Sequence, residues 1–501
     1  MSTKPSDLEQ QAINCIRLLA ADGVEKAQSG HPGMPMGMAD CAYLLYHDVM
    51  RHDPAKPAWP GRDRFLLSAG HGSMLLYSIL HLSGYDLSLD DLKAFRQWGS
   101  RTPGHPERGH TPGVETTTGP LGQGLGNAVG LALASRMLHA RLEGDGFSPS
   151  DFRVFGIVGD GDLMEGLSAE VASLAGHWKL GNLIFIYDDN HISIEGSTEL
   201  AFTEDVAKRF EAQGWHVAEA DAYDREAMRK ALQEAQAETQ RPSLIKAHSH
   251  IGFGSPNKQD TAGVHGSPLG ADELKVTKEN LGWPVEPAFY VPDDVRVLFA
   301  QRAAELTQQR QEWQARYEGW RKAHPDKAAL YDALQQKPVA AELLPALREA
   351  AGAEAAATRA LSGKILQKAA ELLPGLVGGS ADLAPSNKTD LKGLPAVQAG
   401  AYAGRNLHFG VREHAMGSIL NGMALSDGLI PYGGTFLVFA DYMRPPMRLA
   451  ALMGLGCIYV LTHDSIFVGE DGPTHQPVEH LASLRCIPKM TVLRPADPLE
   501  T

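Results

Sequence analysis

Short apolar runs, separated by longer helical stretches, recur along the first half of the chain. Four runs of β-branched and other apolar residues lie at positions 64–68, 153–158, 183–187 and 244–247. Such runs, bounded by turn residues, are typical of strands buried in a parallel sheet. Stretches of helical composition lie at positions 6–27, 128–141 and 165–180. The alternation predicts an α/β domain with a mainly parallel sheet.

The second half of the chain repeats this alternation. Its short apolar runs lie at positions 376–379, 407–409, 429–439, 457–461 and 491–493. A polar helical stretch rich in Gln, Arg and Glu (293–323) and an Ala-rich stretch separate the two halves. We therefore predict two α/β domains, at 1–325 and 356–501, joined by a linker at 326–355.

Polar residues follow two neighbouring strands of the first domain, and these strands point the same way. Asp160 lies just past the end of one run and Asn190 just past the end of the next, so both side chains should meet at the carboxyl edge of the sheet. Carboxylate and amide oxygens suit Mg²⁺ or Ca²⁺. Gly159 and Gly161 allow a diphosphate to approach the backbone. Gly-Asp-Gly followed about thirty residues later by Asp-Asn resembles the thiamine diphosphate-binding motif; the alternative is an ordinary turn with a polar tip.

Three histidines lie in loops that glycine and proline make rigid. They are His31, His71 and His105. Any one of them alone is typical of a solvated loop. Together with a metal-diphosphate motif they favour a site that hydrogen-bonds sugar hydroxyls, because neutral imidazole both donates and accepts. A Gly-rich loop at 119–127 leads into a helix, whose first amides favour an anion, although such a loop alone is weak evidence.

Charge and cysteine usage narrow the class of protein. The formal net charge of −14 argues against non-specific nucleic-acid binding but allows phosphorylated substrates held by local Arg and His side chains. No run of about 18 apolar residues predicts a membrane span, and the polar N-terminus has no signal-peptide core. The four cysteines are far apart and form no CxxC pair, which indicates free thiols. We therefore expect a cytoplasmic enzyme.

Twelve segments of the chain resemble segments of the transketolase family, in that family's order. They are SGHPG, RDRFLLSAGHGSMLLY, TPGHPE, TTTGPLGQGL, GDGDLMEG, YDDN, GFGSPNK, VHG, GGSADLAPSN, FGVREHAM, GGTFLVFADYMR and THDSIFVGEDGPTHQP. An ordered set covering nearly all 501 residues is far more specific than any single segment. The resemblance implies two thiamine diphosphate-binding-fold domains, diphosphate-binding at 1–325 and pyrimidine-binding at 356–501. It also implies a homodimer with active sites at the subunit interface.

Members of that family are longer than this chain. We therefore expect that the last part of the pyrimidine-binding domain and the whole C-terminal domain are absent, which would leave a sheet edge exposed.

The resemblance also assigns cofactor and metal contacts. Asp160, Asn190 and the backbone carbonyl of Ile192 should bind Mg²⁺ or Ca²⁺. Glu413 should meet N1′ of the aminopyrimidine ring and shuttle a proton there. The residues implied for thiamine diphosphate are His71, Gly119, Leu121, Gly161, Asn190, His265, Glu413, Phe439 and Tyr442. For Phe439 and Tyr442 the alternative is plain core packing, which we favour for Tyr442.

Sugar phosphates are the substrates that the resemblance implies. The residues implied around the reacting carbons are His31, His71, His105, His265 and His475, with Asp471 near a substrate hydroxyl. Arg359, Ser386 and His463 should hold the distal phosphate, which suits a guanidinium fork and a hydroxyl. The catalytic residues implied are Glu413, His105, His475, His31 and His265. Either His105 or His475 would act as the base.

The activity implied is reversible transfer of a two-carbon ketol unit, as in the pentose phosphate pathway, from a ketose phosphate such as xylulose 5-phosphate to an aldose phosphate such as ribose 5-phosphate. The alternatives are dihydroxyacetone synthase, 1-deoxyxylulose-5-phosphate synthase, or a cofactor-binding fragment with little turnover. A NAD-dependent dehydrogenase is disfavoured, because no strand leads into GxGxxG with an acidic residue about twenty positions on.

Overall fold

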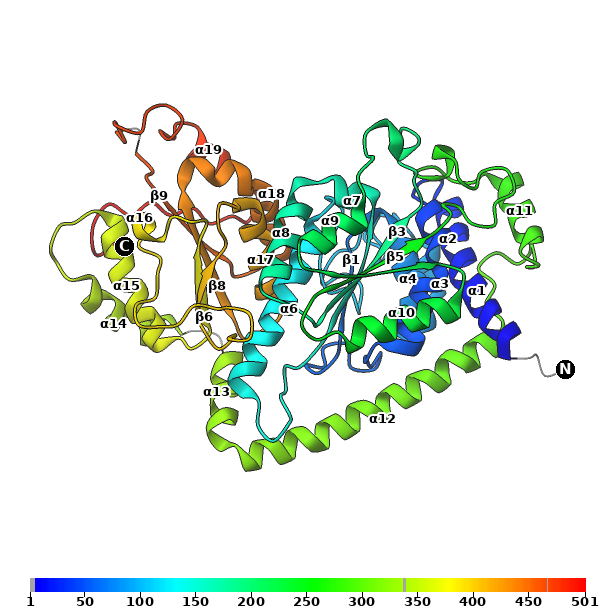
Figure 1. Cartoon of the computed structure of the whole chain (residues 1–501), viewed down its shortest axis with the longest axis horizontal. Coiled ribbons are helices and arrows are strands. Elements are labelled where there is room, and N and C mark those ends of the chain that lie inside the picture. The colour runs from blue at the N-terminus through cyan, green and yellow to red at the C-terminus, as the bar shows by residue number, and fades with distance from the viewer. Residues whose placement is uncertain (1–4, 337–338, 466) are drawn as a thin grey trace. The chain divides into compact units, whose positions relative to one another are not determined.

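The computed structural model describes residues 5–336, 339–465 and 467–501 (Figure 1). The chain divides into two compact units. Unit 1 comprises Met1–Ala128 and Phe152–Arg316, and unit 2 comprises Val129–Asp151 and Tyr317–Thr501. Each unit contains one sheet whose strand pairs are all parallel, so the predicted α/β class is confirmed.

The sheet of unit 1 has five strands in the order β1-β2-β3-β5-β4. They are β1 (Arg64–Leu67), β2 (Val154–Gly159), β3 (Leu183–Asp189), β5 (Ser243–His248) and β4 (His216–Asp221). Four of them were predicted to within two residues at each end. Strand β4 was missed, because its sequence HVAEAD has no apolar run and it lies at the sheet edge, where only Ala220 is buried.

Helices cover the sheet of unit 1 (Figure 1). They are α1 (Pro5–Ala27), α2 (Gly33–Gly37), α3 (Ala39–Tyr43), α4 (Ser73–Leu82), α5 (Leu89–Lys93), α7 (Asp160–Met164), α8 (Gly166–His177), α9 (Val206–Ala212), α10 (Arg225–Ala237) and α11 (Ala271–Asn280). On one face of the sheet, every second residue of a strand, such as Phe155 and Ile157 of β2, is buried in the core. These side chains pack in one cluster with side chains of α1, α4 and α10. This period of two is what a pleated strand imposes. Helices α6 (Gln123–Leu142) and α12 (Asp293–Ala323) contribute residues to both units.

Unit 2 has a four-stranded sheet in the order β7-β6-β8-β9. Its strands are β7 (Asn406–His408), β6 (Leu376–Ser380), β8 (Ile430–Phe436) and β9 (Ile458–Thr462). Its helices are α13 (Pro325–Gln335), α14 (Ala340–Ala351), α15 (Thr358–Leu372), α16 (Ala384–Asn387), α17 (Glu413–Leu425), α18 (Ala440–Met453) and α19 (His480–Arg485).

One predicted strand of unit 2 does not form. Residues 491–493 have no strand structure, and β9 is the outer strand on that side of the sheet among the described residues. The prediction was wrong because a strand needs a paired neighbour and a buried face, and Leu493 is 83% exposed. The predicted linker contains α13 and α14, and its residues 337–338 lie outside the described residues. The boundaries at 325 and 355 stay a prediction.

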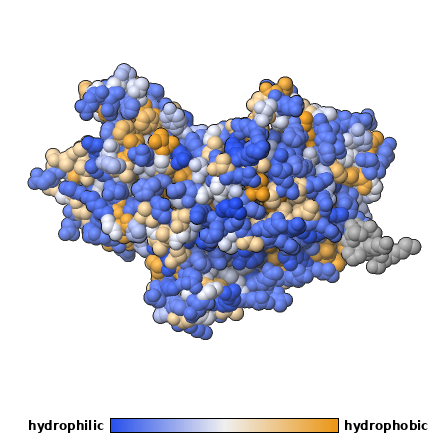
Figure 2. Space-filling view, viewed as in Figure 1, coloured by the Kyte–Doolittle hydropathy of each residue, from blue (hydrophilic) through white to orange (hydrophobic). Residues whose placement is uncertain are grey.

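The surface is mostly hydrophilic on the face drawn in Figure 2, with apolar side chains scattered among polar ones. Among the helices of the described residues, none is long and apolar enough to cross a membrane.

The first turn of α6 is pressed against the end of β1. A Cβ atom built on Gly124 would lie 2.5 Å from Cα of Ser68, the residue after β1. Glycine therefore allows the helix N-terminus to reach the strand end, where an anion would benefit from the helix amides.

We expect Gly124→Ala to lower the free energy of unfolding by about 1–3 kcal/mol, because the Ser68 backbone must move. Urea unfolding followed by circular dichroism measures this. The matched control is Gly319→Ala in α12, where an added Cβ meets nothing within 4 Å and should leave stability equal or slightly higher. Equal effects of the two substitutions would contradict the close packing of α6 on β1.

Candidate active site

A fully buried carboxylate, Asp162, connects three loops at the carboxyl edge of the unit 1 sheet. Its Oδ1 accepts hydrogen bonds from Ser68 Oγ and from the Gly122 amide, each at 2.7 Å. Its Oδ2 accepts from the Gly159 amide at 3.0 Å. Burial raises the pKa of Asp162, and the three hydrogen bonds oppose that rise. The ends of β1 and β2 and the start of α6 are thereby held together.

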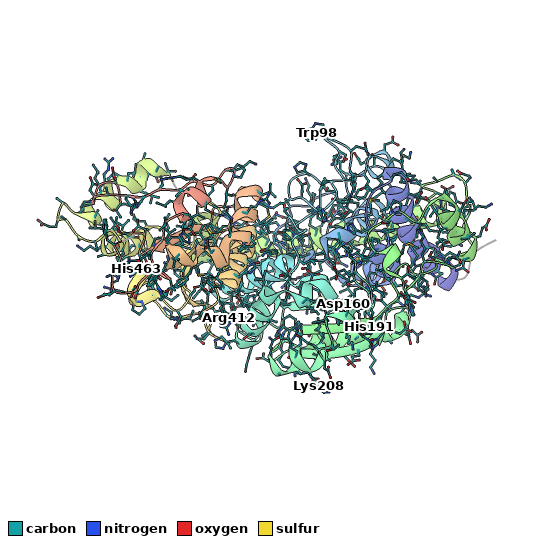
Figure 3. All side chains as sticks on the ribbon, turned by 90° about the horizontal axis from the view of Figure 1, so that it is seen from above. Trp98, Asp160, His191, Lys208, Arg412 and His463 are labelled. Atoms are coloured by element: carbon teal, nitrogen blue, oxygen red, sulfur yellow. The ribbon has the colours of Figure 1, made fainter. Side chains whose placement is uncertain are left out.

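Asp160 lies beside this junction, as the first residue of α7. Its Oδ1 accepts from the Tyr187 hydroxyl at 2.6 Å, whereas Oδ2 is buried without a hydrogen-bond partner. Burial raises the pKa of Asp160 to about 6. Asn190 follows β3, and its side-chain oxygen accepts from the amide of Ile192 at 3.0 Å. Figure 3 shows Asp160 near His191, which lines the same cavity of about 230 Å³. A carboxylate oxygen without a partner fits a hard cation.

The Gly-rich loop before α6 packs against the same edge. Gly119 has φ of 140°, a conformation that glycine adopts readily. A Cβ built on Gly70 would lie 2.7 Å from the Gly119 amide nitrogen, and one on Gly161 would lie 2.9 Å from Leu121 Cδ1. Gly119, Leu121 and Gly161 are therefore adjacent to the strand ends, as a diphosphate cradle requires.

Four histidines from four separate segments form one cluster in unit 1. The ring centroids of His31 and His71 are 5.3 Å apart, and those of His71 and His265 are 5.1 Å apart. His31 also lies 5.9 Å from His265 and 6.2 Å from His105. The predicted set in unit 1 is thus brought together, although His31 and His265 are 234 positions apart in the sequence.

Burial is the main reason that this cluster is uncharged. It lowers the pKa of His31 to about 4, with help from His265 and Arg96, and lowers the pKa of His71 well below its ordinary value. Burial also lowers the pKa of His105 and of His265. At neutral pH the four imidazoles are therefore neutral, and each can both donate and accept a hydrogen bond.

Glu413 begins α17 in unit 2 and is 8% exposed. Thr435 of β8 donates its hydroxyl to Glu413 Oε1 at 3.2 Å. Glu413 is therefore a buried residue within this chain. A buried carboxyl with one hydroxyl partner retains capacity for a further polar ligand.

Aromatic rings line the region between β8 and α18. Phe436 stacks on Phe439 at 5.9 Å between ring centroids, and Phe439 lies 6.2 Å from Tyr442. Phe439 also meets the ring of His475 edge-on at 5.3 Å. The expectation that Tyr442 packs in the core is wrong, because it is 66% exposed. It projects from α18, and its ring is available to a ligand or a partner.

The residues predicted to hold the distal phosphate come together. Arg359 Nη1 donates to the Ser386 carbonyl oxygen at 3.1 Å and lies 3.4 Å from His463 Nε2. Burial and the Arg359 charge lower the pKa of His463, which stacks on Phe436 at 3.7 Å. Asp471 is exposed, and it acts electrostatically on His463. Arg359 lies at the start of α15, Ser386 lies in α16, which follows β6, and His463 directly follows β9.

Two residues at these sites were missed from the sequence. Asp162 was visible as the second acid of GDGD, but a short turn motif does not reveal which donors a carboxylate will meet. Arg96 contacts Ser29 and lies against His31. In the sequence it stands between Phe95 and Gln97, outside any recognisable motif, so nothing there indicated a role in the site.

We expect Asp162→Asn to lower the free energy of unfolding by at least about 2 kcal/mol, because an amide NH₂ would face backbone donors in a buried site. Thiamine diphosphate affinity should fall by about tenfold or more through loss of loop positions. Ser68→Ala removes one of the three donors and should have a smaller effect, about 1 kcal/mol. Urea unfolding and calorimetric titration measure both. Glu195→Gln on an exposed loop serves as control, and an Asp162→Asn protein that matches it would contradict this role.

Comparison with known proteins shows which family this chain resembles. Residues 8–339 match the family described as "Transketolase, thiamine diphosphate binding domain", and residues 354–501 match "Transketolase, pyrimidine binding domain". The chain is 56% identical over 498 residues to a transketolase of Geobacillus stearothermophilus, covering 99% of this chain and 74% of that protein. It is 52% identical to chloroplastic transketolase-1 of Arabidopsis thaliana, covering 68% of that protein.

Solved structures agree as well. Transketolase from Leishmania mexicana superposes with a TM-score of 0.95 at 46% identity, covering 99% of this chain and 74% of that one. A Pichia stipitis transketolase in complex with sedoheptulose-7-phosphate superposes with a TM-score of 0.94 at 45% identity, covering 99% and 76%. The chain therefore belongs to the transketolase family, the thiamine diphosphate-dependent enzymes that transfer a two-carbon ketol unit between sugar phosphates.

Proposed function

We propose that the carboxyl edge of the unit 1 sheet holds the diphosphate of the cofactor together with Mg²⁺ or Ca²⁺. Asp160, Asn190 and the Ile192 carbonyl would ligate the cation. The observation that carries this proposal is the buried Asp160 Oδ2, which has no hydrogen-bond partner. Gly119, Leu121 and Gly161 would contact the diphosphate, whose charge the cation and the α6 amides would balance.

Thiamine diphosphate supplies a nucleophilic carbon and an electron sink for breaking and making the carbon–carbon bond. The chain's own residues orient the reactants and move protons. Glu413 would hold a proton at N1′ of the aminopyrimidine, with Thr435 orienting one of its oxygens. Phe439 and Tyr442 would pack beside that ring. His71 and His265 would complete the cofactor contacts from unit 1.

Sugar phosphates would be recognised at two places. The similar Pichia stipitis transketolase has been solved in complex with sedoheptulose-7-phosphate. Arg359, Ser386 and His463 would bind the distal phosphate in this chain, which suits a guanidinium fork. The neutral His31, His105 and His265 would hydrogen-bond the sugar oxygens near the reacting carbons.

Proton transfer to and from the substrate hydroxyl would fall to His105 or to His475, and Asp471 would bind a hydroxyl. Phe439 lies edge-on to His475, and the Thr474 hydroxyl lies 2.9 Å from its Nδ1, so the ring has an oriented position. A neutral imidazole is able to accept a proton at physiological pH.

We further propose a homodimer, in which unit 1 of one protomer and unit 2 of its partner share each active site. Val411 lies two residues before Glu413 in the chain and is 76% exposed. Tyr442, whose ring lies 6.2 Å from that of Phe439, is 66% exposed. Apolar side chains exposed at a functional edge are typical of an interface.

A cytoplasmic location is proposed from the cysteines, which are all free.

The activity assay measures transfer from xylulose 5-phosphate to ribose 5-phosphate in the presence of thiamine diphosphate and Mg²⁺. We expect sedoheptulose 7-phosphate as the product, and no product after removal of the cation with a chelator.

Glu413→Gln should lower kcat by about 10²–10⁴, because proton transfer at the aminopyrimidine is lost. Thr435→Val, which removes only the orienting hydroxyl, should have a smaller effect. A fully active Glu413→Gln enzyme would contradict the role of this carboxyl in proton transfer at the aminopyrimidine.

The phosphate site is tested by Arg359→Met. We expect KM for phosphorylated ketoses to rise by about 10–100-fold with kcat changed little, because a charge-assisted contact made equally in ground and transition states is lost. An unphosphorylated ketose should be used equally well by variant and parent enzyme. Arg348→Met, an exposed arginine of α14, is the matched control. A selective loss with the unphosphorylated ketose would contradict the assignment.

A further inference from the structure

A charged side chain reaches the histidine cluster from a surface loop. The loop follows α5, and its tip carries Trp98, which is fully exposed and points away from the protein (Figure 3). Two residues earlier, Arg96 turns inward. Its Nη1 donates to Ser29 Oγ at 2.8 Å, and its Nη2 lies 3.5 Å from His31 Nδ1.

The position of Arg96 is held from both backbone and side chain. Its amide donates to the Thr102 carbonyl at 3.0 Å, which closes the loop. Its φ is 62°, a left-handed conformation that is unfavourable for arginine and free of strain for glycine. A Cβ on Gly104 would lie 3.0 Å from Arg96 Nε, so the guanidinium packs directly on that backbone. A strained conformation that carries an ordered charge indicates a role for the side chain.

The charge of Arg96 is not balanced by an acid. Among the described residues, no carboxylate oxygen lies within 4 Å of its guanidinium nitrogens. Its Nε is buried and has no hydrogen-bond partner. A guanidinium so placed acts on the imidazoles around it, because partial burial weakens screening by water.

The contact with His31 decides where that imidazole carries its proton. A guanidinium only donates, so His31 Nδ1 can meet it only as an acceptor. The proton of the neutral ring is then on Nε2. His31 Nε2 faces the segment of His265, since a Cβ built on Gly266 would lie 3.4 Å from it. His31 therefore presents an N–H donor to the interior of the cluster.

The groups that face His31 are Arg96, His71, His105 and His265, and none of these is an acid. Arg96 opposes protonation of His31 and of His105, in addition to the effect of burial on their pKa. Glu107 acts in the opposite direction on His105.

We propose that Arg96 is a positioning residue of the active site, whose guanidinium fixes His31 as the Nε2–H tautomer and keeps His31 and His105 uncharged. The expected effect on catalysis rests on the proposed function, whereas the tautomer of His31 does not. A neutral His105 is able to accept a proton, and His31 donates to a substrate oxygen. Arg96 itself acts through these histidines.

The first experiment measures the pH profile of kcat/KM for two-carbon transfer by the holoenzyme and its Arg96→Met and Arg96→Lys variants. The acidic limb should move to higher pH in Arg96→Met, because loss of the charge raises the pKa of His31 and His105 and they protonate earlier. Arg96→Lys keeps the charge and should move less. Arg101→Met is the matched control, since Arg101 lies in the same loop and pairs with Asp86 and Asp91. An unmoved limb in Arg96→Met, or an equal shift in Arg101→Met, would overturn the proposal.

The second experiment is independent of turnover. Nitrogen chemical shifts of ¹⁵N-histidine-labelled holoenzyme, assigned with His31→Gln, should show a protonated Nε2 and an unprotonated Nδ1 in the parent. In Arg96→Met the His31 signals should move toward a mixture of tautomers. The same tautomer populations in both proteins would overturn the proposal. If the parent enzyme lacked transferase activity, the proposed function would fail while this measurement still decided the tautomer.

A third variant guards against misfolding. Arg96→Gly removes the guanidinium and relieves the positive φ, so it should fold at least as well as the parent. Added ethylguanidinium should restore part of its activity and return the acidic limb toward the parent position. Ethylammonium at the same concentration controls for ionic strength and should restore less. Equal rescue by both cations would contradict the requirement for a planar donor fork.

Discussion

The carboxyl edge of the unit 1 sheet depends on the hydrogen bonds that the buried Asp162 carboxylate accepts. A fully buried carboxylate without partners would be strongly unfavourable, so the chain must bring donors to it. The donors come from the end of β1, the end of β2 and the loop before α6. Because parallel strands all end at one edge, these three segments are already neighbours, and one side chain is enough to hold them. Gly70, Gly119 and Gly161 then allow the loops to approach closely.

The polar groups at this edge are arranged by burial. Asp160 keeps a buried oxygen that has no hydrogen-bond partner, which supports the proposed cation site. Nearby, burial keeps four histidines neutral, so they act as hydrogen-bonding groups at physiological pH. Burial opposes charge on both kinds of group, since it raises the pKa of Asp160 to about 6 and lowers the pKa of the four histidines. The proposed cation would favour the ionised form of Asp160, whereas the neutral histidines need no counterion.

Unit 2 uses the same principle with different side chains. Glu413 follows the short β7 and accepts one hydrogen bond from Thr435 of β8, and Arg359 lies 3.4 Å from His463 after β9. Strand ends again collect residues that are distant in sequence, since a parallel sheet places the carboxyl end of each strand at one edge. Tyr442 differs from our expectation because α18 begins near that edge and exposes one side of the helix, which a pattern of aromatic residues does not reveal.

The sequence by itself determined the strands with continuous apolar runs, the polar residues that end them, and the family, because each depends on local composition or on an ordered set of motifs. It did not reveal strand β4, whose mixed residues carry little periodic signal, and it predicted a strand at 491–493 that lacks a paired neighbour. Only the tertiary structure decided that His31, His71, His105 and His265 share one cluster, that Asp162 joins three loops, and that Arg96 reaches His31. These contacts follow from the order of strands in the sheet and from the paths of the loops, and both arise from packing between segments far apart in the chain.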